Sequence, residues 1–279
     1  WLHEGFATYY AYLAEKELFD EDHFYWKLYD TAKTLHDASE RGQGEALVNP
    51  KASSLTFYEK GAWALVMLRE LVGTTAFRKG IQSYLTTYAY QNATINDFFK
   101  EMEKASGKNL SDFQSDWLEQ KAFPWVEAKS YLEKKNTSLR RFFEAQKIIA
   151  DTMAIQEDKL TLFWNNETPV PFKKQFLFGY GRQLSDSSMK KIIQHEAIEV
   201  RQAAAMVSPK IPETLQSDFE SMLTDDSYIT QEIVLYKLWE AFPERRFEYL
   251  DQLDKTVGLP NKNVRLLWLT LALVTEGYN

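Results

Sequence analysis

The residues best suited to hold a metal ion do not complete a known motif within this sequence. The histidines are His3, His23, His36 and His195. Two of them are followed by glutamate, but the position where a His-Glu-x-x-His motif needs its second histidine holds Ala7 in one case and Glu199 in the other. Because that motif depends on two imidazoles four residues apart on one helix face, the sequence alone predicts no complete zinc site.

Other catalytic motifs are equally incomplete. The chain has no cysteine, which excludes disulfides, thiolate metal sites and cysteine nucleophiles. A Gly-x-Ser-x-Gly nucleophile elbow is absent. Gly179-Tyr180-Gly181 lacks the third glycine of a dinucleotide loop, and Gly107 lacks an upstream glycine at the spacing of a phosphate loop. The 40 acidic residues are too scattered for a catalytic pair to be assigned.

Two longer stretches resemble one family of enzymes. The opening "WLHEGFATYYAYL" resembles the segment "WLNEGFATYxxYL" of the aminopeptidase N type of zinc metallopeptidases, the gluzincins. The stretch "FYEKGAWALVMLRELVGTTAFRKGIQSYLTTYAYQNAT" resembles the family's "YxKGAxVLxMLxxxLGxxxFxxGxxxYxxxxxxxNAT" helix pair. Both occur in the family's order, and together the resemblance covers residues 1–125.

The resemblance implies a role for two residues. Glu4 corresponds to the third zinc ligand, and Tyr58 to the tyrosine that stabilises the tetrahedral intermediate. The two histidine ligands and the general-base glutamate would lie upstream of Trp1. The resemblance thus implies one zinc ion per intact enzyme, with an incomplete site in this chain, and peptides as substrates that lose their amino-terminal residues.

Without the resemblance, each of these residues has a more ordinary structural interpretation. An isolated glutamate is usually a surface or capping residue, and a tyrosine is usually a core residue with a satisfied hydroxyl. Glu59 and Lys60 are not expected to touch the reaction, since a solvated helix start also explains them. His3 stands where the family often has asparagine, and it could orient the neighbouring carboxylate or simply pack. His23 and His36 are interpreted as helix-surface residues.

Helical spacing of apolar residues predicts the elements that must position Glu4 and Tyr58. Asp20 or Asp22 suits the start of the second helix, Asn96-Asp97 a later start, and Gly107 a stop. The segment 39–54 contains two glycines and a proline without periodicity, so we expect a long surface loop. The predicted helices are 1–19, 22–38, 57–72, 74–88, 94–106 and 109–121.

The middle of the chain shows mixed signals. Pro124 breaks the helical pattern and is expected to end the first domain. A polar helix is predicted near 130–148. The β-prone runs 160–164 and 174–178 flank the turn-forming "NNETP", which favours a small β hairpin.

The last part of the sequence carries a faint repeat. "EVRQAAAM" begins at Glu199, "EIVLYKLW" at Glu232 and "NVRLLWLT" at Asn263, and two-helix units stack at such spacings. We interpret this as an α-solenoid of HEAT or armadillo character. The alternative is a chance similarity among ordinary amphipathic helices, because the matched residues are mostly generic apolar ones.

Composition restricts the class of protein. The formal net charge of −7 with dispersed bases argues against nucleic-acid binding. The apolar run ending at Val274 is about half the length that spans a bilayer, so we expect no membrane segment here. The absence of cysteine does not indicate a compartment, so cytoplasmic and exported locations stay open, as does the oligomeric state.

The fold class expected from these patterns is mainly α. Residues 1–127 are predicted to be the helical half of a thermolysin-like catalytic domain, 128–184 a linker helix with a short β segment, and 185–279 a HEAT-like repeat domain. The predicted function is that of a zinc aminopeptidase fragment, inactive alone. The alternatives are a non-catalytic helical-repeat binding scaffold with a degenerate peptidase fold, and an epoxide hydrolase-like relative.

Overall fold

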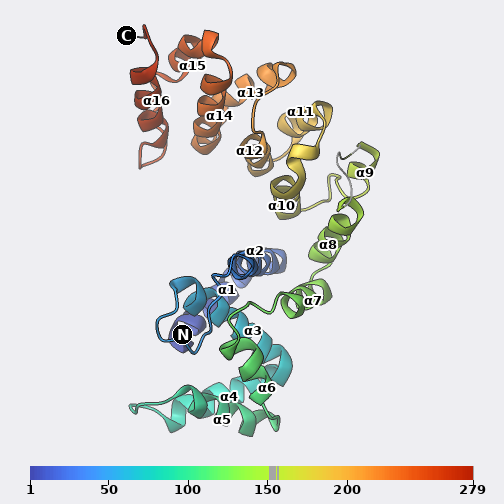
Figure 1. Ribbon diagram of the computed structural model, residues 1–279, viewed down its shortest axis with the longest axis vertical. Coiled ribbons are helices and arrows are strands. Elements are labelled where there is room, and N and C mark those ends of the chain that lie inside the picture. Colours follow the sequence, from blue (N-terminus) through green and yellow to red (C-terminus); the bar gives the residue numbers. More distant parts are fainter. Residues whose placement is uncertain (151–154, 156, 279) are drawn as a thin grey trace. The chain divides into compact units, whose positions relative to one another are not determined.

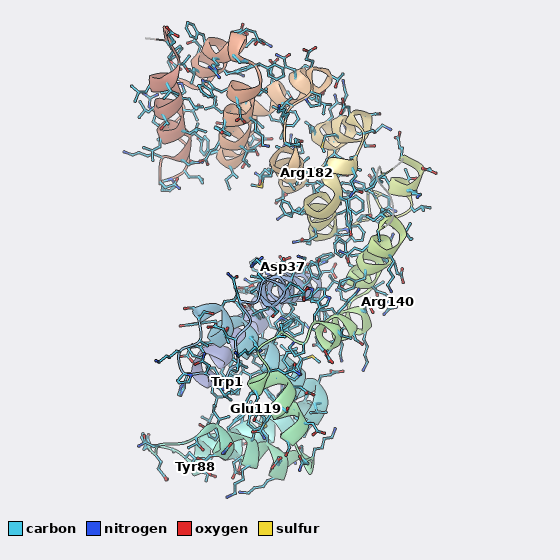
Figure 2. The ribbon with its side chains drawn as sticks, viewed as in Figure 1. Trp1, Asp37, Tyr88, Glu119, Arg140 and Arg182 are labelled. Carbon is cyan, nitrogen blue, oxygen red and sulfur yellow. The ribbon has the colours of Figure 1, made fainter. Side chains whose placement is uncertain are left out.

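The computed structural model describes residues 1–150, 155 and 157–278. These residues form two compact units, Trp1–Arg140 (unit 1) and Arg141–Asn279 (unit 2), and the division falls within helix α8 (Thr137–Ile149), where Figure 2 labels Arg140. The sequence predicts domain boundaries after residues 127 and 184. These boundaries are based on which domain each part belongs to, and contacts between helices do not test that, so they stay predictions.

All regular secondary structure among the described residues of unit 1 is helical, and it agrees closely with the periodicity of the sequence. Asp20 caps the second helix by accepting a hydrogen bond from the backbone N–H of His23 at 2.6 Å. Gly107 ends a later helix in the left-handed conformation, as predicted. The helices and turns are α1 (Leu2–Leu18), α2 (Glu21–Glu40), η1 (Leu55–Lys60), α3 (Gly61–Val72), α4 (Thr74–Thr87), α5 (Ile95–Ser106), α6 (Ser111–Gln114), η2 (Ser115–Glu119) and α7 (Trp125–Lys135).

Helix α1 packs against α3, and α4 pairs with α5 along their length (Figure 1). The core between these helices is rich in aromatic and aliphatic side chains, with Trp63, Leu28 and Phe98 fully buried. Burying this apolar surface is the main source of stability for the unit. The segment between α2 and η1 contains no helix, which confirms the predicted loop.

The predicted β hairpin is wrong. Residues 160–164 lie in a helix and its following turn, and residues 174–178 lie inside a second helix; no strand occurs in the described residues. Phe172 and Phe176 are four residues apart and both are buried, so packing of a helix face overrides their β propensity. The "NNETP" segment is a turn as expected, but it joins two helices.

Unit 2 is a series of helices around one apolar core. Each segment of the sequence repeat lies in a helix, namely α12, α14 or α16, and α12 packs on α14, which packs on α16 (Figure 1). This succession supports the solenoid interpretation, which itself stays a prediction. The elements are α9 (Glu157–Thr161), α10 (Val170–Tyr180), η3 (Gly181–Gln183), α11 (Asp186–His195), α12 (Ile198–Val207), η4 (Glu213–Leu215), α13 (Gln216–Ser221), η5 (Met222–Thr224), α14 (Tyr228–Ala241), η6 (Pro243–Arg245), α15 (Arg246–Leu253) and α16 (Asn263–Val274).

Within the part of the chain that the structure describes, none of the helices combines the length and the apolar character needed to cross a membrane.

Candidate active site

Two glycines fix the crossing of the helices that carry Glu4 and Tyr58. Gly5 follows Glu4 on α1, and Gly61 begins α3 immediately after the turn that contains Tyr58. A Cβ atom on Gly5 would lie 2.9 Å from the backbone carbon of Gly61, and one on Gly61 would lie 3.0 Å from the Cα of Gly5. The first contact is shorter than real Cβ atoms show and the second is tighter than most, so this close approach of the two backbones favours glycine at both positions.

The Glu4 carboxylate lies in the first turn of α1. Its side chain is 37% exposed, and its buried Oε2 atom forms an ion pair with the Trp1 amino group. Oε2 lies 3.1 Å from the amino nitrogen of Trp1. A hydrogen bond from its own backbone N–H and the nearby Trp1 amino group hold the pKa of Glu4 below its usual value. The group is therefore an ionised carboxylate at neutral pH, the form that binds metal ions.

Tyr58 lies in η1, a turn of π-helix that leads into α3. Its side chain is 46% exposed, and its hydroxyl makes no hydrogen bond to any described residue. The alternative of a core tyrosine with a satisfied hydroxyl is therefore wrong. Single π-helical turns often occur at functional sites. An exposed phenol held at a rigid helix start can act as a hydrogen-bond donor to a bound substrate.

Lys60 is not at a solvated helix start, which corrects the expectation from sequence. Its side chain is 1% exposed, and its Nζ donates to the carbonyl oxygens of Glu45 at 2.9 Å, Gln120 at 2.7 Å and Lys121 at 3.2 Å. Burial lowers the pKa of Lys60 to about 8, opposed by the Glu45 carboxylate. Because three carbonyls accept its three N–H bonds, the ammonium holds the 41–54 loop and the end of η2 against η1.

Glu59 connects the same turn to α1. The Tyr12 hydroxyl, on a side chain that is 4% exposed, donates a short hydrogen bond to the Glu59 carboxylate. Burial and the Glu59 carboxylate both raise the pKa of Tyr12, so the phenol stays protonated and remains a donor. The turn that carries Tyr58 is thus tied to the helix that carries Glu4 by a hydrogen bond as well as by the glycine crossing.

Glu45 organises the loop that precedes this turn. Its Oε2 accepts hydrogen bonds from the Ser53 N–H at 2.8 Å, the Ser53 hydroxyl at 2.5 Å and the Thr56 hydroxyl at 2.8 Å. These donors, the Ser53 hydroxyl first, hold the pKa of Glu45 below its usual value. The structural roles of Glu45, Lys60 and Tyr12 were all missed from sequence. The burial of Lys60 could have been suspected from the sequence, because Lys60 directly precedes the apolar run that forms α3.

The histidines do not gather with Glu4. His3 is exposed on α1, so both of its open roles stay predictions. His23 and His36 are each partly covered: the Nε2 of His23 lies 3.1 Å from the Glu15 carboxylate, and the His36 ring stacks on Trp125 with centroids 4.8 Å apart. His195 is exposed at the end of α11. Among the described residues, no group of three or more His, Asp or Glu side chains could hold a metal ion.

Comparison with known proteins relates one part of the sequence to a family. The model of the peptidase family M1 domain matches residues 1–117, the part of the chain that contains the helix crossing and both candidate residues. These residues belong to peptidase family M1. The M1 segment ends within η2, so most of unit 1 and none of unit 2 lies inside it.

Relatives of this M1 segment are named as aminopeptidases. The chain is 34% identical over 154 residues to probable aminopeptidase 2 of Sulfurisphaera tokodaii, covering 51% of this chain and 20% of that protein. It is 34% identical over 137 residues to aminopeptidase M1 of Arabidopsis thaliana, covering 46% and 16%. It is 32% identical over 118 residues to aminopeptidase N of Lactococcus lactis, covering 42% and 14%. The chain thus spans a fifth or less of these relatives, and no solved structure matches it.

Proposed function

We propose that this chain is part of a zinc-dependent aminopeptidase in which Glu4 is a zinc ligand and Tyr58 stabilises the oxyanion of the reaction. One observation carries the proposal: within the M1 segment, an ionised carboxylate and an exposed phenol lie on two helices whose crossing is fixed by Gly5 and Gly61. The names of the relatives support removal of amino-terminal residues from peptides as the activity.

Glu4 suits the role of a metal ligand. Its carboxyl group is ionised at neutral pH, and an ionised carboxylate is one of the oxygen ligands that zinc takes in proteins. A catalytic zinc site takes three protein ligands. Since no group of three such side chains occurs in the described part of the chain, Glu4 would act together with two ligands from outside it. The chain alone is therefore expected to be inactive.

The proposed chemistry divides between the metal and the phenol. A zinc ion in such a site supplies a Lewis acid that polarises a carbonyl and lowers the pKa of water. Glu4 contributes a carboxylate oxygen to hold the ion. Tyr58 donates a hydrogen bond to the carbonyl oxygen as negative charge develops on it, so its contribution is larger in the transition state than in the ground state.

The test uses the full-length protein with aminoacyl-anilide substrates. Glu4→Gln is expected to lower the bound zinc, because a neutral amide is a poorer ligand than a carboxylate. Tyr58→Phe is expected to keep zinc and KM and to lower kcat by about 100- to 1,000-fold, the usual loss for one oxyanion donor. Tyr10→Phe is the matched control, since Tyr10 is a similarly exposed phenol on α1.

Three results would contradict the proposal. Normal turnover by Tyr58→Phe would reduce Tyr58 to a packing residue. Hydrolysis by this chain alone would show that it contains a complete site of another kind. A full-length protein that folds but contains no zinc and is inert toward peptides would favour the non-catalytic scaffold instead.

A further inference from the structure

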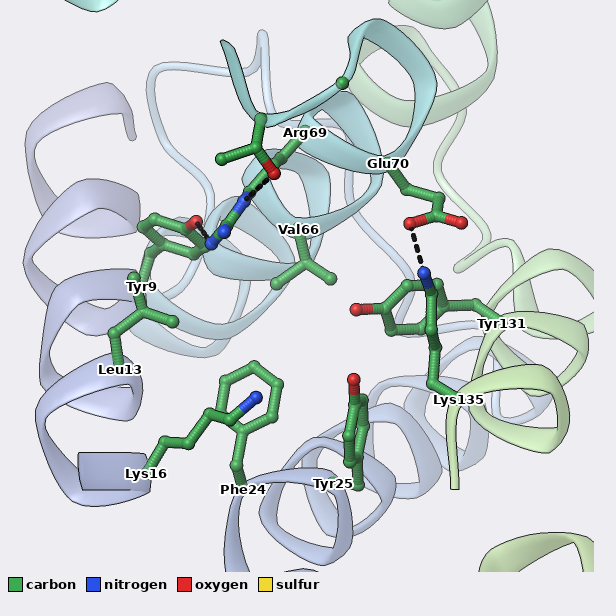
Figure 3. Close-up of a pocket in the computed structure, with 12 residues that line it drawn as sticks. Tyr9, Leu13, Lys16, Phe24, Tyr25, Val66, Arg69, Glu70, Tyr131 and Lys135 are labelled. Carbon is green, nitrogen blue, oxygen red and sulfur yellow. Dashed lines mark hydrogen bonds and ion pairs between the residues drawn. The ribbon is translucent and has the colours of Figure 1, made fainter. Parts of the chain in front are cut away.

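A cavity of about 210 Å³ lies inside unit 1 and is lined by none of the residues assigned to the proposed active site. Its walls come from α1, the start of α2, the end of α3, the α3–α4 junction and α7 (Figure 3). The cavity is smaller than the roughly 300–1,000 Å³ of pockets that hold drug-sized ligands. Any ligand that fits within it is therefore small.

The lining carries an excess of positive charge in a chain whose net charge is negative. Its three basic residues face one acidic residue, Glu70. Lys135 pairs with Glu70 at 2.8 Å, and Glu70 also pairs with the exposed Lys134 outside the lining at 3.3 Å. Lys16 pairs with Glu21 at 2.6 Å. The third basic residue, Arg69, has no carboxylate partner among the described residues. One uncompensated positive charge therefore remains in the wall.

Arg69 is held in place by neutral groups. Its Nη1 donates to the Tyr9 hydroxyl at 2.9 Å, and its Nε donates to the Thr74 hydroxyl at 3.3 Å (Figure 3). Its Nη2 makes no hydrogen bond to a described residue. Two contacts thus fix the plane of the guanidinium while one edge keeps N–H donors for a ligand, and guanidinium geometry matches a carboxylate.

Two phenols face the cavity opposite Arg69. Figure 3 shows the hydroxyls of Tyr25 and Tyr131 pointing toward its middle, and their rings are 6.3 Å apart. Burial, the neighbouring Tyr25 and the Glu70 carboxylate raise the pKa of Tyr131, so its hydroxyl stays protonated and can donate. Leu13, Phe24 and Val66 supply apolar walls between the polar groups.

We propose that this cavity binds a small organic monocarboxylate, with its carboxylate on Arg69 and the Tyr131 hydroxyl and its apolar body against Leu13, Phe24 and Val66. A monoanion is favoured over a dianion because Lys16 and Lys135 are already paired, which leaves Arg69 alone to balance a ligand charge. The apolar walls favour a carbon body over a bare inorganic ion. The proposal does not depend on the proposed peptidase activity.

The experiment is a calorimetric titration of the full chain with 3-phenylpropionate, its neutral amide and inorganic phosphate at physiological ionic strength. We expect one saturable site for 3-phenylpropionate and weaker binding of the amide by about 10-fold or more, because the amide forgoes a charge-assisted hydrogen bond. Arg69→Gln and Tyr131→Phe are each expected to weaken 3-phenylpropionate binding by a similar factor. Arg78→Gln is the matched control, since Arg78 is an exposed arginine outside the lining.

Several outcomes would overturn the proposal. Equal binding of the amide would show that the cavity does not recognise charge, and equal or tighter binding of phosphate would show that it does not select a carboxylate. A comparable loss in Arg78→Gln would show that only surface charge is involved. If Arg69→Gln fails to fold by near-ultraviolet circular dichroism, undiminished affinity in Tyr131→Phe, which removes a single oxygen, would overturn it.

Discussion

In unit 1 the buried ammonium of Lys60 is surrounded by three backbone carbonyls, whereas in unit 2 the buried ammonium of Lys173 faces a carboxylate, Glu196, at 2.7 Å. Arg201 and Asp225 form a second ion pair in unit 2, with the Asp225 side chain fully buried. Unit 2 thus neutralises these buried charges with carboxylates that directly follow its helices. Unit 1 uses a buried charge to hold two separate stretches of backbone, at residue 45 and at residues 120–121, against the turn that carries Tyr58.

The difference indicates two uses of a buried lysine. An ion pair between helices contributes to packing and can often be replaced by apolar side chains without losing the fold. An ammonium shared by carbonyls from residues 45, 120 and 121 satisfies backbone acceptors in irregular segments that no regular helix hydrogen bond serves. The first kind is expected to matter for stability alone, and the second for stability and for the position of Tyr58.

The largest expected effect separates these two lysines. Lys60→Met is expected to destabilise unit 1 by about 3 kcal/mol or more, since three carbonyls lose hydrogen bonds to a charged donor. In the full-length protein it should also lower kcat by about 10- to 100-fold through misplacement of Tyr58. Hydrogen exchange resolved by peptide, together with anilide turnover, measures both quantities.

Lys173→Met is the matched control in unit 2. It should destabilise unit 2 by about 3 kcal/mol, because the Glu196 carboxylate loses its partner, while leaving turnover unchanged. If both variants lowered kcat equally, or if neither did, the distinction between the two buried lysines would be wrong.

The surroundings of Lys60 also show what the sequence could reveal. Glu4 and Tyr58 stand inside the two stretches that resemble the gluzincin family, and only that resemblance singles them out. Lys60 stands in the same stretch, but its partner carbonyls at residues 120 and 121 are about sixty positions away. Contacts of that range depend on how helices pack, which residue types and spacing do not specify.

The secondary structure was also only partly predictable from the sequence. Helix spacing was largely predictable in unit 1, as were the caps at Asp20 and Gly107, which act locally. The start predicted at Asn96-Asp97 is instead at Ile95, with Thr94 as the cap. Phe172 and Phe176 misled the prediction because aromatic residues favour strands in general, yet here they fill one face of α10. The π-helical turn at Tyr58 was also not predictable, because the local sequence pattern is that of an ordinary helix.

A smaller effect is expected from two buried tyrosines on α1. Tyr12→Phe removes the hydroxyl that reaches Glu59 in η1, and Tyr9→Phe removes the hydroxyl that receives Arg69 from α3. Both side chains are almost fully buried, at 4% and 2% exposure, so each variant should cost about 1 kcal/mol of stability. Only Tyr12→Phe should lower kcat in the full-length protein, by several-fold, with KM and zinc retained.

Comparing the two variants separates the effect of the Tyr12–Glu59 contact from the effect of lost stability. If both variants lost turnover equally, the cause would be a general loss of stability in α1 and not the contact with Glu59. Unchanged turnover in Tyr12→Phe, with the expected loss of stability, would show that the contact between Tyr12 and Glu59 does not position Tyr58.

The smallest expected effect is a pH dependence that compares one carboxylate from each unit. The Ser53 hydroxyl, the Ser53 N–H and the Thr56 hydroxyl hold the pKa of Glu45 below its usual value. Glu220 in unit 2 also has a lowered pKa, because hydrogen bonds from Tyr249 and Arg245 outweigh the opposing effect of burial. For both groups the folded-state pKa lies below the unfolded value. Their stabilisation is therefore present above the unfolded pKa and is lost as pH falls through the folded pKa.

Salt distinguishes the two carboxylates. The hydrogen-bond donors to Glu45 are neutral, and the Lys60 ammonium that also interacts with it is buried from salt, so the acid-induced loss of protection in the 41–54 loop should be nearly independent of ionic strength. Glu220 is paired with the partly exposed Arg245, so its contribution should shrink in 1 M salt, where the screening length is about 3 Å. Glu45→Gln should make loop protection independent of pH in this range, because the amide oxygen still accepts these hydrogen bonds but does not titrate. If the 41–54 loop still lost protection on acidification in Glu45→Gln, a group other than Glu45 would be responsible for its pH dependence.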